Sequence, residues 1–518
     1  MKMKKNIRAQ LAGLVILGLT AQAGQAALVD MAEYQDWDAV EASISTEDVN
    51  AVQPDGMTAL FWATYYDETD VVRLLLNAGA NPNIENRYGM TPLIQAAMNG
   101  NSDMISMLLD AGADANATTP EGDNALLNAS KTGAAEGVQA LIDAGANVNS
   151  LDGYLFQTPL MWAASANQAD VVRILIDNGA NINMRSPALE LRGVRQGAVS
   201  GDFPNGGLTA LHHAARENAI DATRVLIAEG ADLNVLDPHD ISPLRFAIIN
   251  ANIDLAKVLV EAGANMNDGA LVDLIDVETK ELTFVRSEKN YENQTSPMEL
   301  IELMLSMGVE IDAYPEQAYP FPATGFRGGA GTANRTALFN LAMEDNQDLI
   351  AMFLEHGANP NSLNMDGKYF PLSAALGVVP VRGGNMMMED GEEAETEISE
   401  SVQLLLDNGA DVNAIAGDGT SVLHQAVSTG NETVVEFLIA EGADLSIKDN
   451  SNRTALDVAN GVSPVSDGSE PRRGPPGSEP AELPVYEEIA TLLTEAMYAQ
   501  GITIEEYVAP VTEESGEA

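Results

Sequence analysis

The chain is long, strongly acidic and free of cysteine. It has 518 residues, of which 77 are Asp or Glu and 26 are Lys or Arg, and its formal net charge at pH 7 is −51. This acidic excess excludes nucleic acid as a main partner, because phosphate binding needs a basic surface. The absence of cysteine excludes disulfides, thiolate metal sites, iron–sulfur clusters and a cysteine nucleophile. A hydrophobic content of 45% is enough for a buried core, so we expect a folded protein.

Residues 1–26 have the pattern of a secretory signal peptide. A basic start precedes a short apolar stretch, 11–20, and small residues that end at Ala26. The apolar stretch is too short to span the ~30 Å of a bilayer core, so we expect cleavage after Ala26 and export without a membrane anchor. Because the segment carries four basic residues and no acidic one, its removal changes the net charge from −51 to −55. The pattern predicts a protein of the bacterial periplasm, with secretion into the medium as the alternative.

From residue 27 onward, two short phrases recur at a period of about 33 residues. One phrase is Gly-Ala-x-x-Asn, as in 79–83 and 112–116. The other is Thr-Pro-Leu or a close variant of it, as in 91–93 and 158–160. Self-similarity at this period is typical of a solenoid, in which each repeat contacts only its neighbours.

Each repeat has the sequence of two helices followed by a turn. The Thr or Ser before Pro-Leu can cap a first helix, and proline at the first helical position loses no hydrogen bond. The second helix is amphipathic, as in 71–76, and stops at a glycine that can adopt the left-handed conformation. The Asn and Asp that follow favour a turn, so we expect a hairpin that leads into the next repeat. No repeat can bury its apolar face alone, and stacking must supply the core.

The order Thr-Pro-Leu-x-x-Ala, Val-Val-x-x-Leu-Leu and Gly-Ala-x-x-Asn resembles the ankyrin repeat, and the period agrees with it. The resemblance covers nearly all of residues 27–499. An acidic tail, 500–518, follows this repeat region. The resemblance implies an all-α solenoid of about twelve stacked helix-turn-helix repeats with β-hairpin fingers. It also implies protein binding on a concave face formed by the first helices and the fingers.

Five insertions interrupt the period, near 184–207, 277–294, 313–334, 378–400 and 461–485. Loops of this length are usually functional or disordered. The first and third contain Arg and aromatic residues, which are enriched at the energetic centres of protein interfaces. We predict that these two inserts help to hold a partner; the alternative is that they are tolerated, mobile loops. The predicted contact residues are Arg185, Arg192, Arg195, Phe203, Tyr314, Tyr319, Phe321, Phe326 and Arg327.

Two tryptophans lie at matching positions of first helices. Trp62 follows Leu60 and Phe61, and Trp162 follows Leu160 and Met161. If the first helices line the concave face, both side chains belong to a stripe that contacts a partner. The alternative is that they pack within the stack.

No catalytic, cofactor or metal site is predicted. With 77 acidic residues, close carboxylate pairs arise by chance and do not indicate glycosidase chemistry. The glycine-rich stretch 328–331 lacks the Gly-Lys-Ser/Thr ending of a phosphate loop, and no Gly-x-Ser-x-Gly nucleophile motif occurs. The three consecutive methionines at 386–388 have no His or Cys nearby in sequence, which favours packing or partner contact over a copper site.

The sequence therefore predicts a non-catalytic scaffold or adaptor, monomeric and exported, that binds proteins without a cofactor. A partner with a positive or mixed-charge surface fits the acidic field best. Two other functions stay open. One is a secreted effector that binds host proteins, and the other is an accessory subunit that stabilises an exported oxidoreductase.

Overall fold

The computed structural model describes residues 27–190, 204–280, 293–313, 335–364, 366–379, 398–463 and 484–503. These residues form two compact units, one that ends at Pro238 and one that begins at His239. The predicted signal peptide, most of each predicted insert and most of the predicted tail lie outside the described residues.

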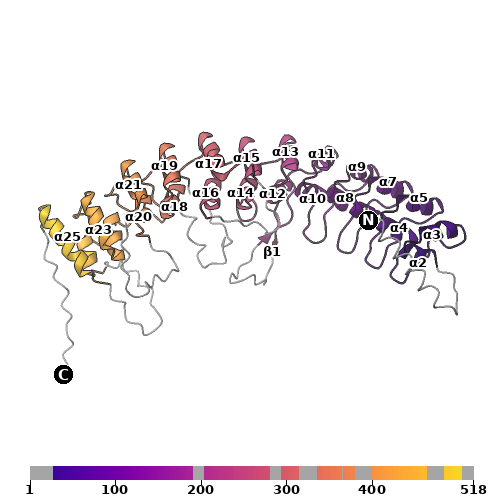
Figure 1. Ribbon diagram of the computed structural model, residues 1–518, viewed down its shortest axis with the longest axis horizontal. Coiled ribbons are helices and arrows are strands. Elements are labelled where there is room, and N and C mark those ends of the chain that lie inside the picture. The colour runs from indigo at the N-terminus through magenta and orange to yellow at the C-terminus, as the bar shows by residue number, and fades with distance from the viewer. Residues whose placement is uncertain are drawn as a thin grey trace, which may run out of the picture. The chain divides into compact units, whose positions relative to one another are not determined.

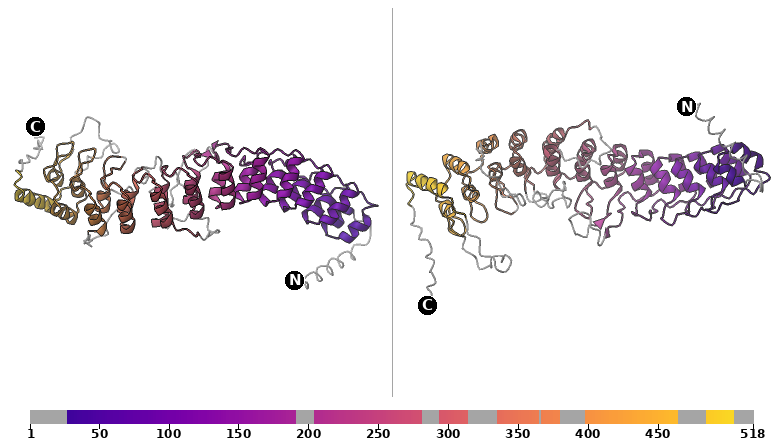
Figure 2. Two further views of the ribbon diagram at one scale, coloured as in Figure 1. Left: turned by 90° about the horizontal axis from the view of Figure 1, so that it is seen from above. Right: turned by 60° about the horizontal axis from the view of Figure 1, so that its bottom comes forward.

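Unit 1 contains six consecutive helix pairs in its described residues. The pairs are α2 (Leu28–Glu33) with α3 (Trp37–Ser43), α4 (Ala59–Tyr65) with α5 (Thr69–Asn77), α6 (Pro92–Asn99) with α7 (Ser102–Asp110), α8 (Ala125–Thr132) with α9 (Ala135–Asp143), α10 (Pro159–Ser165) with α11 (Ala169–Asp177), and α12 (Ala210–Arg216) with α13 (Ile220–Ala228). Two short strands, β1 (Leu189–Glu190) and β2 (Pro204–Asn205), pair antiparallel between α11 and α12, with Leu189 opposite Asn205. The first helices form one row and the second helices another, and turn segments extend from the first row (Figures 1 and 2).

Unit 2 repeats the same plan in its described residues. Its pairs are α14 (Pro243–Ile249) with α15 (Ile253–Glu261), α16 (Ala270–Lys280) with α17 (Pro297–Ser306), α18 (Ala337–Met343) with α19 (Gln347–Glu355), α20 (Pro371–Ala375) with α21 (Glu400–Asp407), α22 (Val422–Thr429) with α23 (Glu432–Ala440), and α24 (Ala455–Ala459) with α25 (Glu487–Ala499). No helix of the described residues is long and apolar enough to cross a bilayer.

The helix ends form as the repeated phrases predict. The Thr91 hydroxyl accepts a hydrogen bond from the Ile94 amide at 3.3 Å, and Thr158 accepts one from Met161 at 3.2 Å. In both helices the next residue is proline, whose missing N–H would have had no partner. After α5, Gly79 has φ +88°, the left-handed conformation that ends the helix.

The core lies between neighbouring pairs. First helices pack on first helices, as α6 does on α8, and second helices on second helices, as α7 does on α9. Ile105 and Leu108 of α7 and Val138 of α9 are fully buried. This arrangement confirms that stacking, rather than any single pair, buries the apolar faces.

The turn segments, which we call fingers, are joined by a ladder of asparagines. Asn83 donates from its side-chain amide to the Gly112 carbonyl at 2.8 Å and accepts from the Asp114 backbone amide at 2.7 Å. Each rung thus satisfies one donor and one acceptor of the next repeat. The same pair of bonds recurs at Asn50, Asn116, Asn149, Asn361 and Asn413.

The fingers are built from turns rather than strands. Among the described residues, the antiparallel pairing in fingers consists of isolated bridges, Thr118 with Asn124 and Ile415 with Ser421. The strands β1 and β2 belong to the base of the first insert. The helical solenoid is therefore supported, whereas β-hairpin fingers are not confirmed.

Adjacent fingers approach closely where two glycines meet. The Gly153 amide donates to the Glu121 carbonyl at 3.0 Å. A side chain on Gly122, which has φ +82°, would place its Cβ 2.7 Å from the Cα of Gly153. Glycine at both positions therefore lets the finger 151–157 rest on its neighbour.

We expect Gly122→Ala to destabilise unit 1 more than Gly79→Ala. Both substitutions place alanine in the left-handed conformation, which is unfavourable by about 1 kcal/mol, but nothing lies within 4 Å of a Cβ at Gly79. The clash at Gly122 should add roughly 1 kcal/mol or more. Urea unfolding of the two purified variants measures the difference, and equal losses would show that the fingers separate without strain.

Candidate protein-binding surface

The first helices of unit 1 place two side chains per repeat on the side that meets the fingers. In α4 these are Trp62 and Tyr65, which lie three residues apart and so share a helix face. The Trp62 indole donates to the side-chain oxygen of Gln53, in the preceding finger, at 3.0 Å. We call the ten side chains at these two positions of α4, α6, α8, α10 and α12 the first-helix face, although Gln95 and His213 are themselves buried: Trp62, Tyr65, Gln95, Met98, Asn128, Lys131, Trp162, Ser165, His213 and Arg216.

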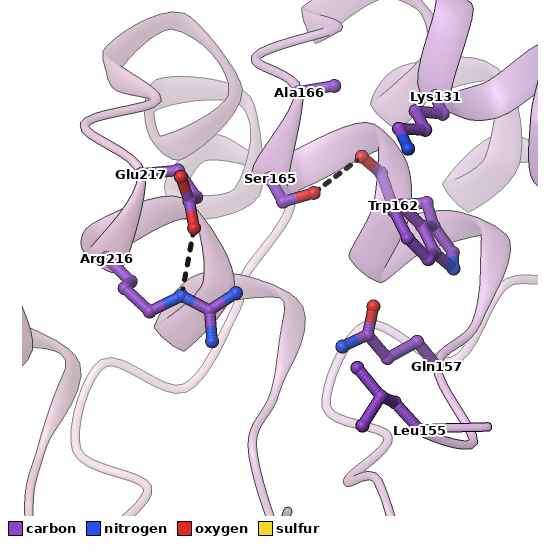
Figure 3. A pocket seen from close by; sticks show the side chains of 8 residues that line it. All are labelled: Lys131, Leu155, Gln157, Trp162, Ser165, Ala166, Arg216 and Glu217. Carbon is purple, nitrogen blue, oxygen red and sulfur yellow. Dashed lines mark hydrogen bonds and ion pairs between the residues drawn. The ribbon is translucent and has the colours of Figure 1, made fainter. Parts of the chain in front are cut away.

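Trp162 forms one wall of a hollow of about 300 Å³, which we call the α10 hollow (Figure 3). Helices α8, α10 and α12 and the finger before α10 all contribute to its wall. The lining residues are Lys131, Leu155, Gln157, Trp162, Ser165, Ala166, Arg216 and Glu217. A concave site with an aromatic wall and a few polar groups is the usual form of a contact pocket.

Asp152 fixes the finger against this hollow. Its carboxylate accepts from the Trp162 indole at 3.1 Å and from the backbone amides of Tyr154 and Leu155 at 3.0 and 2.6 Å. Asp152 is itself buried, but Tyr154 is 81% exposed and Leu155 is 41% exposed. The buried carboxylate therefore fixes the part of the finger from which Tyr154 and Leu155 extend toward solvent, and Leu155 lines the hollow.

The hollow brings two cations together on an acidic chain, with the carboxylates of Glu217 and Asp152 beside them. The Lys131 ammonium lies 4.5 Å from the centroid of the Trp162 ring, a cation–π geometry. Arg216 donates from Nε to Glu217 at 3.0 Å, and Figure 3 shows its guanidinium and the Gln157 amide turned toward the same central space. Lys131 and Arg216 are two of the seven Lys or Arg residues among the described residues of unit 1. Two of these seven cations thus line a single hollow.

His213 supports Arg216 from inside the stack. Arg216 donates to Nδ1 of His213 at 3.3 Å, and because a guanidinium can only donate, this nitrogen must be unprotonated. Burial lowers the pKa of His213 to about 3, and the positive charge of Arg216 acts in the same direction. The imidazole is therefore neutral at ordinary pH.

Trp62 lies in a second aromatic group, at the start of unit 1. Its ring stacks on Tyr66 with centroids 5.8 Å apart and an interplanar angle of 18°, and Tyr65 meets it edge-on at 5.7 Å. Trp37 of α3 meets Tyr66 edge-on at 6.1 Å. Both predicted tryptophans are half-buried, so each one packs against the stack and also presents surface to solvent.

Arg185 has a structural role at the base of the first insert. Its guanidinium donates to the carbonyls of Gly207 at 3.0 Å and Leu236 at 2.7 Å, so that it joins the insert to the next finger. The other predicted insert residues lie outside the described residues, and their contact role stays a prediction. These are Arg192, Arg195, Phe203, Tyr314, Tyr319, Phe321, Phe326 and Arg327.

Unit 2 has a smaller hollow of about 170 Å³ at the matching place, between its fingers and first helices. Lys368, His424 and Arg453 are among its lining residues. The Arg453 guanidinium is held by Asp449 at 2.7 Å, and His424 donates from Nε2 to the Arg453 carbonyl at 3.0 Å. Among the described residues, no group of three His, Asp or Glu side chains could hold a metal ion.

The family models for ankyrin repeats match this architecture. One, for three repeat copies, matches residues 28–119, 112–186 and 192–270, and another, for many copies, matches 405–459. Together they cover more than half of the chain. The chain belongs to the ankyrin repeat family. Ankyrin repeats are in general non-catalytic modules that bind proteins, and this chain is in that general sense a protein-binding scaffold.

The chain spans less than half the length of the first two curated relatives that it matches. The chain is 25% identical over 276 residues to an Arabidopsis thaliana E3 ubiquitin-protein ligase, KEG, and 29% identical over 257 residues to the mouse B-cell lymphoma 3 protein homolog. These matches cover 51% and 49% of this chain but only 15% and 48% of the relatives. The solved ankyrin repeat domain of human ASB11 is 23% identical, with 46% of this chain and 98% of that chain covered and a TM-score of 0.38.

The sequence predicted Trp162 as a contact residue, but it did not point to the other residues that line the α10 hollow. Lys131 and Arg216 occupy the same repeat position as Tyr65, three residues after the Trp62 position, and that offset was readable from the repeat alignment. Asp152 could not be recognised in the same way, because an Asp in a finger resembles any turn residue.

We expect the stability that neutral His213 contributes to the fold to decrease as the pH is lowered. Its folded pKa of about 3 lies below the unfolded value near 6.5, so between these values the unfolded chain binds a proton that the folded chain does not. Stability therefore decreases as pH falls through this window, by about 1.4 kcal/mol per pH unit from this group.

The comparison of wild type with His213→Asn isolates this effect from the many carboxylates. The difference in unfolding free energy between the two should shrink from pH 7 to pH 5. Parallel curves for wild type and His213→Asn would contradict the assignment.

Proposed function

We propose that this chain is an exported scaffold of the bacterial periplasm that holds a partner protein on the first-helix face and fingers of unit 1. The α10 hollow is the main contact. The observation that carries the proposal is the joint placement of Trp162, Lys131 and Arg216 around one hollow, whose wall also includes the exposed Leu155. Tryptophan, tyrosine and arginine are the side chains that contribute most to binding energy at protein interfaces.

The charge pattern supports a partner of mixed charge. The long-range field of a chain with net charge −51 attracts positive surfaces and speeds encounter. The α10 hollow presents the exposed Lys131, which favours an acidic group of the partner at short range, whereas Arg216 is paired with Glu217. A partner that carries both signs satisfies both conditions.

Export is supported by the pattern of residues 1–26, with a basic start, a short apolar stretch and small residues before position 27. The first described helix begins at Leu28, directly after the proposed cleavage point. The domain organisation proposed is thus a signal peptide, a repeat array over 27–499 with five inserts, and an acidic tail.

We expect Lys131→Glu to weaken partner capture. Lys131 is exposed and lines the α10 hollow, so reversal of its charge should lower the affinity about tenfold. The matched control is Arg173→Glu on α11, which makes the same charge change at an exposed site in the other helix row and should change affinity less than twofold. The measurement is capture of exported proteins on the immobilised chain, followed by titration with the captured partner. Equal weakening by both variants would show that only the overall charge matters.

We expect the chain to be recovered from the periplasmic fraction with Ala27 as its first residue. Mass spectrometry of the purified protein identifies the N-terminus, and fractionation of cells and medium locates it. Recovery of an intact residue 1 in the cytosol would remove the export proposal, and recovery in the medium alone would favour a secreted effector.

A further inference from the structure

Five aromatic side chains gather on the first two helix pairs, in what we call the N-terminal aromatic surface: Tyr34, Trp37, Trp62, Tyr65 and Tyr66. Tyr34 is 79% exposed and Tyr65 is 52% exposed. Tyr65 and Tyr66 meet edge-on with centroids 5.1 Å apart, and Tyr66 contacts both tryptophans. The Tyr66 hydroxyl donates to the Glu33 carbonyl at 3.3 Å, which joins the surface to the end of α2. Four of the five rings, those of Trp37, Trp62, Tyr65 and Tyr66, hold one another in place, so this part of the surface is formed before any partner arrives.

Two carboxylates, those of Asp30 and Glu33, are linked to Trp62 through Gln53. The Gln53 amide nitrogen donates to Asp30 at 3.1 Å and to Glu33 at 2.7 Å, and its oxygen accepts from the Trp62 indole at 3.0 Å. One neutral amide thus holds two negative groups beside the tryptophan. Gln53 does not neutralise either charge, so the edge of the aromatic surface is negative.

The whole segment around this surface lacks cations. Residues 27–68 contain ten Asp or Glu and no Lys, Arg or His. The next basic residue, Arg73, pairs with Asp70 at 3.0 Å on the surface of α5, and the guanidinium of Arg87 lies over its own neighbour Tyr88, 5.0 Å from the ring centroid. Aromatic rings with a surplus of negative charge and no nearby cation attract positive groups through both the ring quadrupole and the carboxylates.

We propose that the N-terminal aromatic surface binds lysine or arginine side chains of an extended segment of the partner protein. The aliphatic stems of these side chains can lie on the exposed rings while their charged ends reach Asp30 and Glu33. This inference rests on the proposed function as a protein-binding scaffold, but it concerns a different set of residues from the α10 hollow. It assigns the positive part of a mixed-charge partner to the first two repeats.

A short peptide of alternating lysine and serine, capped at both ends, tests the proposal. It should bind the purified chain, and the same peptide with every lysine acetylated should bind at least tenfold more weakly. Higher salt should weaken binding of the lysine peptide, since much of the attraction is electrostatic. Equal binding of the acetylated peptide would overturn the proposal and show an apolar docking site instead.

Matched variants separate this surface from the general acidic charge of the chain. Tyr65→Ala removes an exposed ring without a change of charge and should weaken binding about threefold or more, whereas Tyr498→Ala, which removes a 68% exposed ring on α25, should not. Glu33→Gln should weaken binding more than Glu136→Gln, which makes the same charge change on α9. The unfolding midpoint of each variant checks that the fold is retained.

Two results would refute the assignment. If Tyr65→Ala and Glu33→Gln behave like their controls, lysine binds diffusely over the acidic surface. If Tyr65→Ala instead abolishes a concentration-dependent dimer of the chain, the surface is occupied by a second copy. Neither result affects the Lys131→Glu comparison, so this inference and the proposed function fail separately.

Discussion

The structure depends on apolar burial between repeats that are too short to fold alone. Among the described residues the longest helix has 13 residues, and many have seven to nine. Isolated helices of this length are marginal in water, so each pair gains its stability from the pairs on either side. The asparagine ladder applies the same rule to the fingers, because Asn83 satisfies polar groups of the next repeat and not of its own. Each repeat is therefore completed by its neighbours.

This constraint separates the residues that build the stack from those free to recognise a partner. Positions such as Leu108 and Val138 are fully buried between pairs and leave little room for variation. The first-helix face is different: at one repeat position it holds Tyr65, Met98, Lys131, Ser165 and Arg216 in successive repeats. Chemistry at that position can change without loss of the core, which is how a common scaffold acquires a particular binding surface.

The sequence predicted what is local and periodic, and it missed what several repeats build together. Thr91 and Thr158 act as caps, Gly79 ends its helix and the pairs stack, because each of these features follows from a few consecutive residues. The α10 hollow could not be predicted in the same way, since Lys131, Gln157 and Arg216 lie in segments that are up to 85 residues apart in the sequence. Arg185 was predicted as a contact residue from its type, but its bonds to Gly207 and Leu236 show that a surface arginine can serve the fold. The expectation of strands in the fingers was not confirmed, because side-chain bonds from Asn and Asp do there what a strand ladder would do.

The distribution of charge along the first-helix face of unit 1 can orient a bound partner segment. The start of the unit has ten acidic residues and no basic one over 27–68, whereas Lys131 and Arg216 flank Trp162 farther along the same face. Both regions carry aromatic rings, so apolar contact alone would not distinguish them. Opposite local charge would distinguish them, because a partner segment reversed in direction would bring like charges together, which is unfavourable by several kcal/mol at close range. If the two proposed contacts are both made, a partner chain with a basic part and an acidic part can lie along α4 to α12 in only one orientation. That orientation is set by the surface of the repeats rather than by their core.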